Sequence, residues 1–371
     1  AQKRIDSYDR LQKTVNELRS QVDVSHASAF YELVYYPVVC ASWMNKKFLY
    51  RDKAFLYSKQ NRISAFDYTA LSKRAYDSIA NETEYYNKIL ANGKWQYMMS
   101  MKPRDLPVFQ EPVFPSIKIK KAGGWNIAEE GCDTRDCKHE LPYFVEGVDQ
   151  RYFIDIFLTD SADIEWKAST SADWIRLSLQ KGALHVERNK NQTRLWVTVD
   201  WKKLSSKESA QGQILFYGGG RKLTLGVHAF QPKVSAGKIL KGFVESNGYV
   251  SMYACHFTQK GIASNSDWKR VEALAHTTAS MISVVRQSSN FSEASVKRNT
   301  SYLAFDFYSF NKDSARAIIY TLPTHPLDKF NGMRYAFCVD NGPVQIMDFK
   351  TIGRSEEWKQ NVLSNEAIKK S

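Results

Sequence analysis

Three residues of types that can do chemistry, Cys132, Cys137 and His139, lie close together in the sequence. The cysteines bound a polar segment, Gly-Cys-Asp-Thr-Arg-Asp-Cys, in which a local disulfide can form. Thiolates and imidazoles also bind zinc, which would need two ligands besides the cysteines, and only His139 is nearby. Since five cysteines are too few and too scattered for a disulfide framework, we expect two loop thiols or one loop disulfide, and no metal.

Motifs of known catalytic types are not found elsewhere in the sequence. There is no Gly-x-Ser-x-Gly elbow and no His-Glu-x-x-His helix, and Gly218–Gly220 precedes a strand-like run instead of a phosphate-binding helix. The seven histidines lack ligand spacing. Glycoside hydrolysis needs two facing carboxylates, and the sequence does not tell which of 39 acidic residues could face each other. We therefore assign no catalytic residue and no cofactor.

Aromatic residues are abundant, at 13% of the chain. Aromatic rings stack on the apolar faces of sugars, and they also fill the cores of β-sandwiches. Trp174 and Trp196 lie in strand-like patterns, so we expect both in a core. Trp201 precedes Lys202 and Lys203, so we expect it to be exposed and free to contact a ligand.

The net charge of +13 over 371 residues favours anionic partners, such as nucleic acid, acidic glycans or another protein surface. The basic residues are scattered and form no nucleic-acid-binding motif, so we expect a solvated basic surface and no nucleic acid. No apolar run approaches the roughly 18 residues of a membrane span. The start lacks a basic-then-apolar leader, so an export signal is absent or already removed.

Apolar periodicity predicts a helical bundle over residues 1–102. Apolar residues recur at three- and four-residue steps between Ile5 and Leu18. Ser25 is expected to cap a second helix, which Pro37 should kink or break because proline lacks an amide hydrogen. A third helix is predicted from Leu71 to Leu90, ending at Asn92-Gly93.

The pattern changes after the bundle. Four prolines within 103–115 predict an extended linker. Alternating residues then predict a β-sandwich over 116–232, with Gly218–Gly220 as a hairpin loop. Its expected strands cover 151–158, 195–199, 213–217 and 223–227.

A second all-β unit is predicted over 242–371, with a turn at Asn341-Gly342. Its expected strands cover 249–253, 302–308, 315–321, 333–339 and 344–348.

Several segments, in the same order along the chain, resemble glycoside hydrolase family 115, the xylan α-glucuronidases. They are Ala29–Val38 (Ala-Phe-Tyr-Glu-Leu-Val-Tyr-Tyr-Pro-Val), Lys94–Met99 (similar to the family's Lys-Trp-Asn-His-Met-Met), Gly242–Glu245, Gly248–Ser251, Gly332–Ala336 and Pro343–Gln345. The stretches 172–175 and 196–200 resemble the immunoglobulin-like sandwiches common in polysaccharide-degrading enzymes.

The resemblance implies a helical bundle followed by two β-sandwich units, one immunoglobulin-like and one jelly-roll-like, the latter expected to be incomplete. The family's catalytic carboxylates lie in a barrel that precedes the bundle, so no catalytic residue carries over to this chain. The intact enzyme would remove (4-O-methyl)glucuronic acid from glucuronoxylan. The expected partner is this plant cell-wall glycan or a related acidic polysaccharide, the expected location is secreted, periplasmic or cell-surface, and a homodimer is compatible.

This chain also departs from the family. Tyr97, Ser100 and Met101 stand where members carry His, Asp and Gln, which leaves the substrate open. The family's Glu-Ala-Glu-His appears as Tyr-Ala-Cys-His at 253–256, and the loss of two carboxylates argues against a calcium site. The glycan-contact candidates are Trp95, Tyr97 and Trp201. The alternative hypothesis is a standalone glycan-binding or structural module without catalysis.

Overall fold

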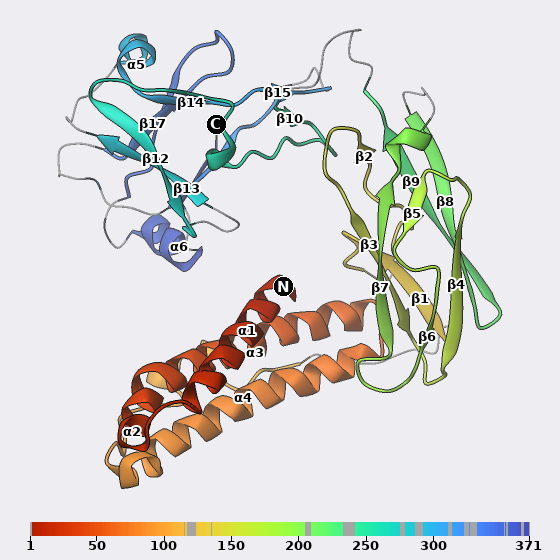
Figure 1. Cartoon of the computed structure of the whole chain (residues 1–371), viewed down its shortest axis with the longest axis vertical. Coiled ribbons are helices and arrows are strands. Elements are labelled where there is room, and N and C mark those ends of the chain that lie inside the picture. The colour runs from red at the N-terminus through yellow and green to blue at the C-terminus, as the bar shows by residue number, and fades with distance from the viewer. Residues whose placement is uncertain are drawn as a thin grey trace. The chain divides into compact units, whose positions relative to one another are not determined.

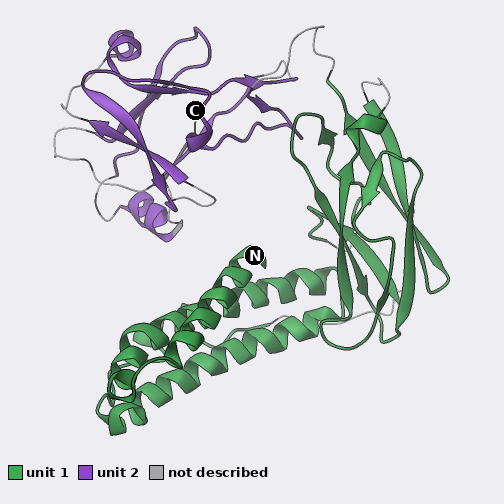
Figure 2. Cartoon of the chain, viewed as in Figure 1, with its two compact units in different colours: residues 1–232 green, residues 233–371 purple. Residues whose placement is uncertain are grey.

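The computed structural model describes residues 2–114, 116, 124–134, 136–204, 209–232, 242–274, 279–285, 292–310, 314–322, 326, 332–351, 353, 355–364 and 367–370. The chain divides into two compact units, residues 1–232 and 233–371 (Figure 2). A helical region comes first and a β-rich region follows it, as predicted (Figure 1). In the part of the chain that is described, no helix combines the length and apolar character needed to cross a membrane.

Unit 1 begins with the helices α1 (Gln2–Arg19), α2 (Ala27–Phe30), α3 (Tyr36–Lys59) and α4 (Ser64–Lys88), of which α3 packs along both α1 and α4 (Figure 1). Ile5 and Val15 are buried, whereas Leu11 and Leu18 stay about half exposed, so only part of the predicted apolar stripe of α1 is covered. The predicted end of the third helix is confirmed, since the left-handed residues Ala91 and Asn92 follow α4.

The break expected at Pro37 is a local change of helix type. A π-helical turn, η2 (Tyr31–Tyr35), joins α2 to α3, and the amide of Tyr36 donates to the carbonyl of Tyr31. Such a turn accommodates an interruption of the regular hydrogen-bond ladder without ending the helix. The cap predicted at Ser25 is wrong: the Asp23 carboxylate accepts the Ser25 amide at 2.9 Å and caps the short 3₁₀ helix η1 (Val24–His26).

The segment after α4 is tied to the helices. It contains the 3₁₀ helices η3 (Leu90–Gly93), η4 (Pro103–Asp105) and η5 (Pro107–Phe109), so its proline-rich part is partly turned and not wholly extended. The buried ammonium group of Lys47 donates to the carbonyls of Val108 and Gln110 at 2.6 and 3.1 Å. Pro115 lies outside the described residues.

Two sheets complete unit 1. One has the order β1-β3-β7-β5 and the other β2-β9-β8-β4-β6, with β2 and β9 as the one parallel pair among the described strands of these sheets. The strands are β1 (Trp125–Glu129), β2 (Phe144–Val145), β3 (Tyr152–Leu158), β4 (Ile164–Thr170), β5 (Ile175–Leu177), β6 (Lys181–Leu184), β7 (Gln192–Val199), β8 (Ser209–Gly218) and β9 (Arg221–Phe230).

Both sheets contribute to one hydrophobic core, which includes Ile156 and Val197 from one and Phe216 and Val227 from the other. The predicted hairpin is confirmed: Gly218 pairs with Arg221 across a two-residue loop. Both loop glycines, at φ 51° and 73°, have the left-handed backbone that this turn requires.

The two tryptophans expected in the core differ. Trp174 is buried there, as predicted. Trp196 is only half-buried, because its neighbours Leu195 and Val197 face the core and alternation along β7 turns Trp196 to the other side. It packs edge-on against Phe153, and the Arg151 guanidinium lies 4.6 Å from its ring.

Unit 2 consists of short elements. Its helices are α5 (Glu293–Asn299) and α6 (Glu356–Ser364). Its strands are β10 (Phe243–Val244), β11 (Gln259–Gly261), β12 (Ser266–Glu272), β13 (Ala279–Val285), β14 (Tyr302–Ala304), β15 (Phe307–Tyr308), β16 (Ile318–Thr321), β17 (Arg334–Phe337), β18 (Gln345–Asp348) and β19 (Ala367–Lys370), which pair two by two.

Several predictions for unit 2 need correction. The strand expected over 249–253 is absent among the described residues there: Tyr249 forms an isolated bridge with Ser246, and the chain then enters a 3₁₀ helix, η7 (Ala254–His256). The strand over 302–308 is two short strands, β14 and β15. The turn at Asn341-Gly342 is confirmed, because β17 and β18 pair antiparallel around it.

Candidate functional site

The candidate site lies in unit 1, where the turn between α3 and α4 meets the first sheet. The amide of Ile63 in this turn donates to the carbonyl of Leu158 at the end of β3. Arg62 is 2% exposed, and its guanidinium contacts the Asp155 carboxylate at 3.0 Å. Arg194 on β7 binds the same carboxylate through two nitrogens, at 2.7 and 3.0 Å. The buried positive charge of Arg62 is therefore paired, and the turn is held against the sheet.

A cleft of about 320 Å³ opens beside this turn. Thr159 lies in it after β3, and Arg221 contributes from β9. Asp136 carries the one carboxylate among the described residues that line the cleft, whereas glycoside hydrolysis uses a facing pair. The full lining is Gln60, Asn61, Asn126, Asp136, Cys137, His139, Thr159, Arg221 and Leu223.

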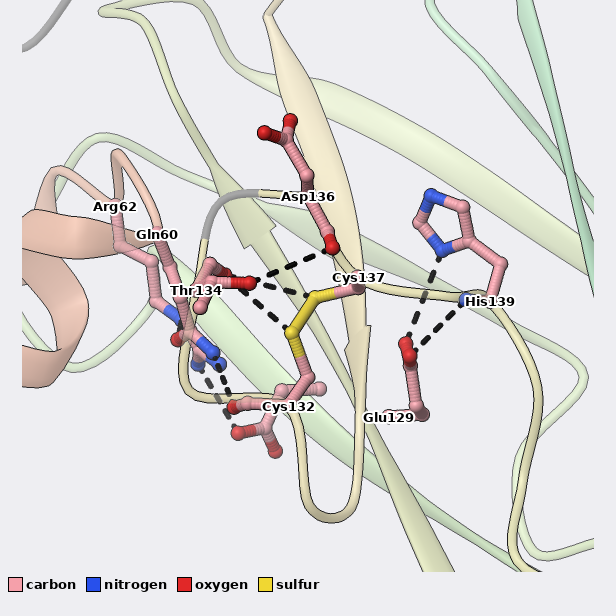
Figure 3. The surroundings of a disulfide bond; sticks show 9 residues. Gln60, Arg62, Glu129, Cys132, Thr134, Asp136, Cys137 and His139 are labelled. Atoms are coloured by element: carbon pink, nitrogen blue, oxygen red, sulfur yellow. Dashed lines mark hydrogen bonds and ion pairs between the residues drawn. A yellow bond between two sulfur atoms is a disulfide. The ribbon is translucent and has the colours of Figure 1, made fainter.

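The loop after β1 forms one wall of the cleft, and it contains the disulfide Cys132–Cys137 (Figure 3). Of the two alternatives left open by the sequence, the structure shows the bonded one. The Gln60 side chain in the α3–α4 turn donates to the carbonyl of Cys132 at 2.8 Å, which connects the loop to the helices.

Glu129, the last residue of β1, holds the far end of this loop. Its side chain is 5% exposed, and its Oε1 accepts the backbone amide of His139 at 3.0 Å. Its Oε2 lies 3.8 Å from His139 Nδ1, and both atoms point toward each other beside the disulfide (Figure 3). Among the described atoms, neither Glu129 Oε2 nor His139 Nδ1 has a hydrogen-bond partner, and Thr159 Oγ1 also lacks one. Buried polar atoms are normally paired, so these atoms mark a place suited to a polar ligand or an ion.

The predicted glycan-contact residues do not form one group. Trp95 is half-buried against the aromatic cluster of the helical bundle, with the Lys94 ammonium 4.5 Å from its ring. Tyr97 is 87% exposed in the same segment. Trp201 packs against the core of the two sheets and is half-buried, so the exposed position expected for it is wrong.

The aromatic cluster of the bundle holds its polar groups in their neutral forms. Burial raises the pKa of Tyr36 to about 12 and that of the Cys40 thiol to about 12. Burial, followed by the hydrogen bond to Glu82, also raises the pKa of Tyr31 far above its usual range. Because the thiolate and the phenolate are the nucleophilic forms of these groups, the raised pKa values argue against nucleophilic roles for them near neutral pH.

Sequence reasoning missed two parts of the site, Glu129 and the pair of Arg62 with Asp155. No strand was predicted over residues 125–129, although the alternation of apolar residues from Trp125 could have indicated one. The partners Arg62 and Asp155 are 93 residues apart, and no local pattern connects them.

Comparison with known proteins identifies the C-terminal part of the chain. Residues 242–371 match the family model described as the glycosyl hydrolase family 115 C-terminal domain. The match agrees with the resemblance to glycoside hydrolase family 115 that the sequence predicted. No curated protein matches the chain.

Solved structures with some similarity include BtGH115A, a family 115 4-O-methyl-α-glucuronidase with specificity for decorated arabinogalactans. It is 22% identical, with a TM-score of 0.26 over 61% of this chain, and the chain spans about a third (32%) of its length. A FixG-related protein from Vibrio parahaemolyticus is 8% identical, with a TM-score of 0.20, over 30% of this chain and 96% of its own. A PapD-like domain of human CEP192 is 9% identical, with a TM-score of 0.22, over 34% of this chain and 96% of its own.

Proposed function

We propose that this chain is the non-catalytic C-terminal part of a family 115-like α-glucuronidase, which removes (4-O-methyl)glucuronic acid side chains from glucuronoxylan. The observation that carries the proposal is the family match over residues 242–371. The alternative is a standalone glycan-binding or structural module without catalysis.

The architecture that goes with this proposal has a helical bundle over 1–102, a linker over 103–115, an immunoglobulin-like sandwich over 116–232 and a jelly-roll-like sandwich over 242–371. The shared core of the two sheets in unit 1 supports the first sandwich. Homologues in this family act on extracellular glycans, which supports a secreted, periplasmic or cell-surface location and a role in xylan degradation. The proposal includes a homodimer of this protein.

The proposed glycan contact is centred on Tyr97, with Trp95 beside it and Trp201 as a lesser candidate. Tyr97 presents a freely exposed ring, which a sugar ring can stack on. Trp95 and Trp201 use part of their surfaces for packing, so less of each ring is left for a ligand. The positive net charge would favour the uronic acid groups of the glycan.

Catalysis is tested by incubating the chain with glucuronoxylan and measuring released glucuronic acid. We expect none. Decorated arabinogalactan is the second substrate, because the similar BtGH115A is specific for it. Release from either polymer by this chain alone would overturn the non-catalytic role.

Glycan contact is tested by electrophoresis in gels that contain glucuronoxylan or decorated arabinogalactan. We expect the chain to be retarded in one of them, and Tyr97→Ala to migrate as it does without polymer. Tyr217→Ala, which removes another exposed tyrosine from β8, is the matched control and should remain retarded. Unchanged migration of the unaltered chain in both gels would contradict glycan binding.

A further inference from the structure

We propose that the loop after β1 is a zinc site in its reduced form, with Glu129, Cys132, Cys137 and His139 as the four ligands. This proposal is independent of the proposed glycan function. In this proposal the loop has two alternative forms. In one the cysteines are bonded to each other, and in the other both are bound to a Zn²⁺ ion.

Three of the four proposed ligands already lie close together, and the fourth, His139, lies beside Glu129. One carboxylate oxygen of Glu129 and the sulfur atoms of Cys132 and Cys137 all lie within 4.8 Å of one another. His139 Nδ1 lies 3.8 Å from Glu129 Oε2, on the same side of the loop (Figure 3). Zinc bonds of about 2.0–2.3 Å in a tetrahedron place neighbouring ligand atoms about 3.3–3.8 Å apart. His139 lies outside the group formed by the other three ligands, so reduction must first separate the two bonded sulfur atoms and the loop must then bring the imidazole toward them.

The polar atoms beside the disulfide are those that a metal would occupy. Glu129 Oε2 and His139 Nδ1 are buried and have no hydrogen-bond partner among the described atoms, although the other oxygen of Glu129 is used by the loop backbone. The backbone contact holds the Glu129 carboxylate in place, and its second oxygen stays available to a metal ion. Two thiolates and one carboxylate would also offset the 2+ charge of the ion.

The spacing suits one short loop. The ligands follow the pattern Glu-x₂-Cys-x₄-Cys-x-His, so a single segment of the chain supplies all four. The first ligand ends strand β1, and Gly131, with a φ of 90°, lies in the bend that brings the first cysteine back toward it. Tetrahedral sites built from cysteine with histidine or carboxylate ligands are typical of zinc.

Formation of the site requires reduction of the disulfide. A dithiol reductant supplies two electrons and two protons, which breaks the S–S bond into two thiols and leaves the reductant as its own disulfide. Zn²⁺ then replaces the two thiol protons, which are released to solvent, and binds the neutral imidazole and the ionised carboxylate. Reoxidation of the cysteines would expel the ion.

The test uses the full chain with Cys338→Ser, which removes an exposed free thiol. The disulfide is reduced without air, and Zn²⁺ is titrated against a chromophoric chelator. We expect one ion per reduced chain, release of two protons per ion, and no binding of comparable strength by the oxidised chain. With Co²⁺ in place of Zn²⁺, we expect the thiolate-to-cobalt charge-transfer band and the strong visible bands of a tetrahedral site.

Variants separate the four-ligand site from binding by thiols alone. Cys132→Ser with Cys137→Ser should abolish binding, and Glu129→Gln and His139→Asn should each weaken it at least about tenfold. Asp136→Asn, in the same loop but outside the ligand set, is the matched control and should bind as before. Equal affinities of Glu129→Gln, His139→Asn and Asp136→Asn would overturn the proposal, and so would a reduced unaltered chain that binds no more tightly than the double serine variant.

A second measurement does not depend on how the variants fold. Zn²⁺ added to the reduced, otherwise unaltered chain should protect Cys132 and Cys137 from alkylation, as read by mass spectrometry of the peptide that contains them. Alkylation of both cysteines at an unchanged rate would also overturn the proposal.

Discussion

At the scale of single residues, Asp155 is central to the contact between the helices and the sheet, because two arginines share its carboxylate. Asp155→Asn would leave the 2% exposed Arg62 without its counter-charge. Loss of one partner of a buried ion pair costs about 3–5 kcal/mol, so we expect the free energy of unfolding to fall by about that amount. Urea denaturation followed by circular dichroism measures it.

The control for Asp155→Asn is Glu84→Gln, which breaks an exposed ion pair with Lys88 on α4. Solvent screens that pair, so its loss should leave the urea midpoint unchanged within error. If the two variants are equally stable, burial of the Arg62 charge does not require the Asp155 carboxylate.

A second residue, Lys53, should make stability depend on pH. Burial, and then the positive charge of Arg194, lower the pKa of Lys53 from 10.5 to about 8. Between pH 8 and 10 the unfolded chain therefore holds more of this proton than the folded chain, so the free energy of unfolding should rise with pH. With allowance for partial contact with water, the rise is on the order of 2 kcal/mol.

Lys53→Met provides the measurement for this effect. The variant should be more stable than the unaltered chain at pH 7, and its urea midpoint should lack the rise between pH 8 and 10. Because tyrosines with a raised pKa, such as Tyr68, act in the opposite direction above pH 10, the comparison is confined to lower pH. If the urea midpoint of Lys53→Met still rises between pH 8 and 10, a group other than Lys53 causes the rise.

At the scale of elements, β6 depends on a glycine that faces a tryptophan. Gly182 pairs with Trp166 of β4, and a Cβ atom at position 182 would lie 2.9 Å from the indole ring. Trp166 is 1% exposed, so its ring has little room to move. Overpacking of this kind costs about 1–3 kcal/mol, and we expect Gly182→Ala to lower the free energy of unfolding by that amount in thermal or urea denaturation.

Gly220→Asn in the β8–β9 loop is the control for Gly182→Ala. A Cβ atom at position 220 would meet nothing within 4 Å, and asparagine tolerates the left-handed backbone found there. We expect a change of less than about 0.5 kcal/mol. A Gly182→Ala chain as stable as this control would show that the indole can shift aside.

At the scale of the whole molecule, unit 1 should fold without unit 2. It has its own shared core between two sheets, and the ion pairs of Arg62, Asp155 and Arg194 lie wholly within it. We expect a fragment of residues 1–232 to unfold in one cooperative thermal transition, with near-ultraviolet circular dichroism from its buried tryptophans. A fragment without such a transition would show that unit 1 needs residues 233–371 to fold.

The sequence by itself determined the elements that depend on neighbours along the chain. The helical periodicity, the change to alternating strands, the hairpin at Gly218–Gly220 and the turn at Asn341-Gly342 were predictable, because local backbone preferences set them. The strand predicted at 249–253 shows the limit of this reasoning, since a run of suitable residues forms a strand only where another strand pairs with it.

Only the tertiary structure decided which side chains meet. Arg62 finds Asp155 because the α3–α4 turn packs on the end of a sheet, and Trp196 faces away from the core because its register in β7 is set by pairing with β3. Glu129 stands beside Cys132, Cys137 and His139 because β1 ends there and the loop folds back on it. Such contacts depend on packing and register between distant segments, which local spacing does not encode.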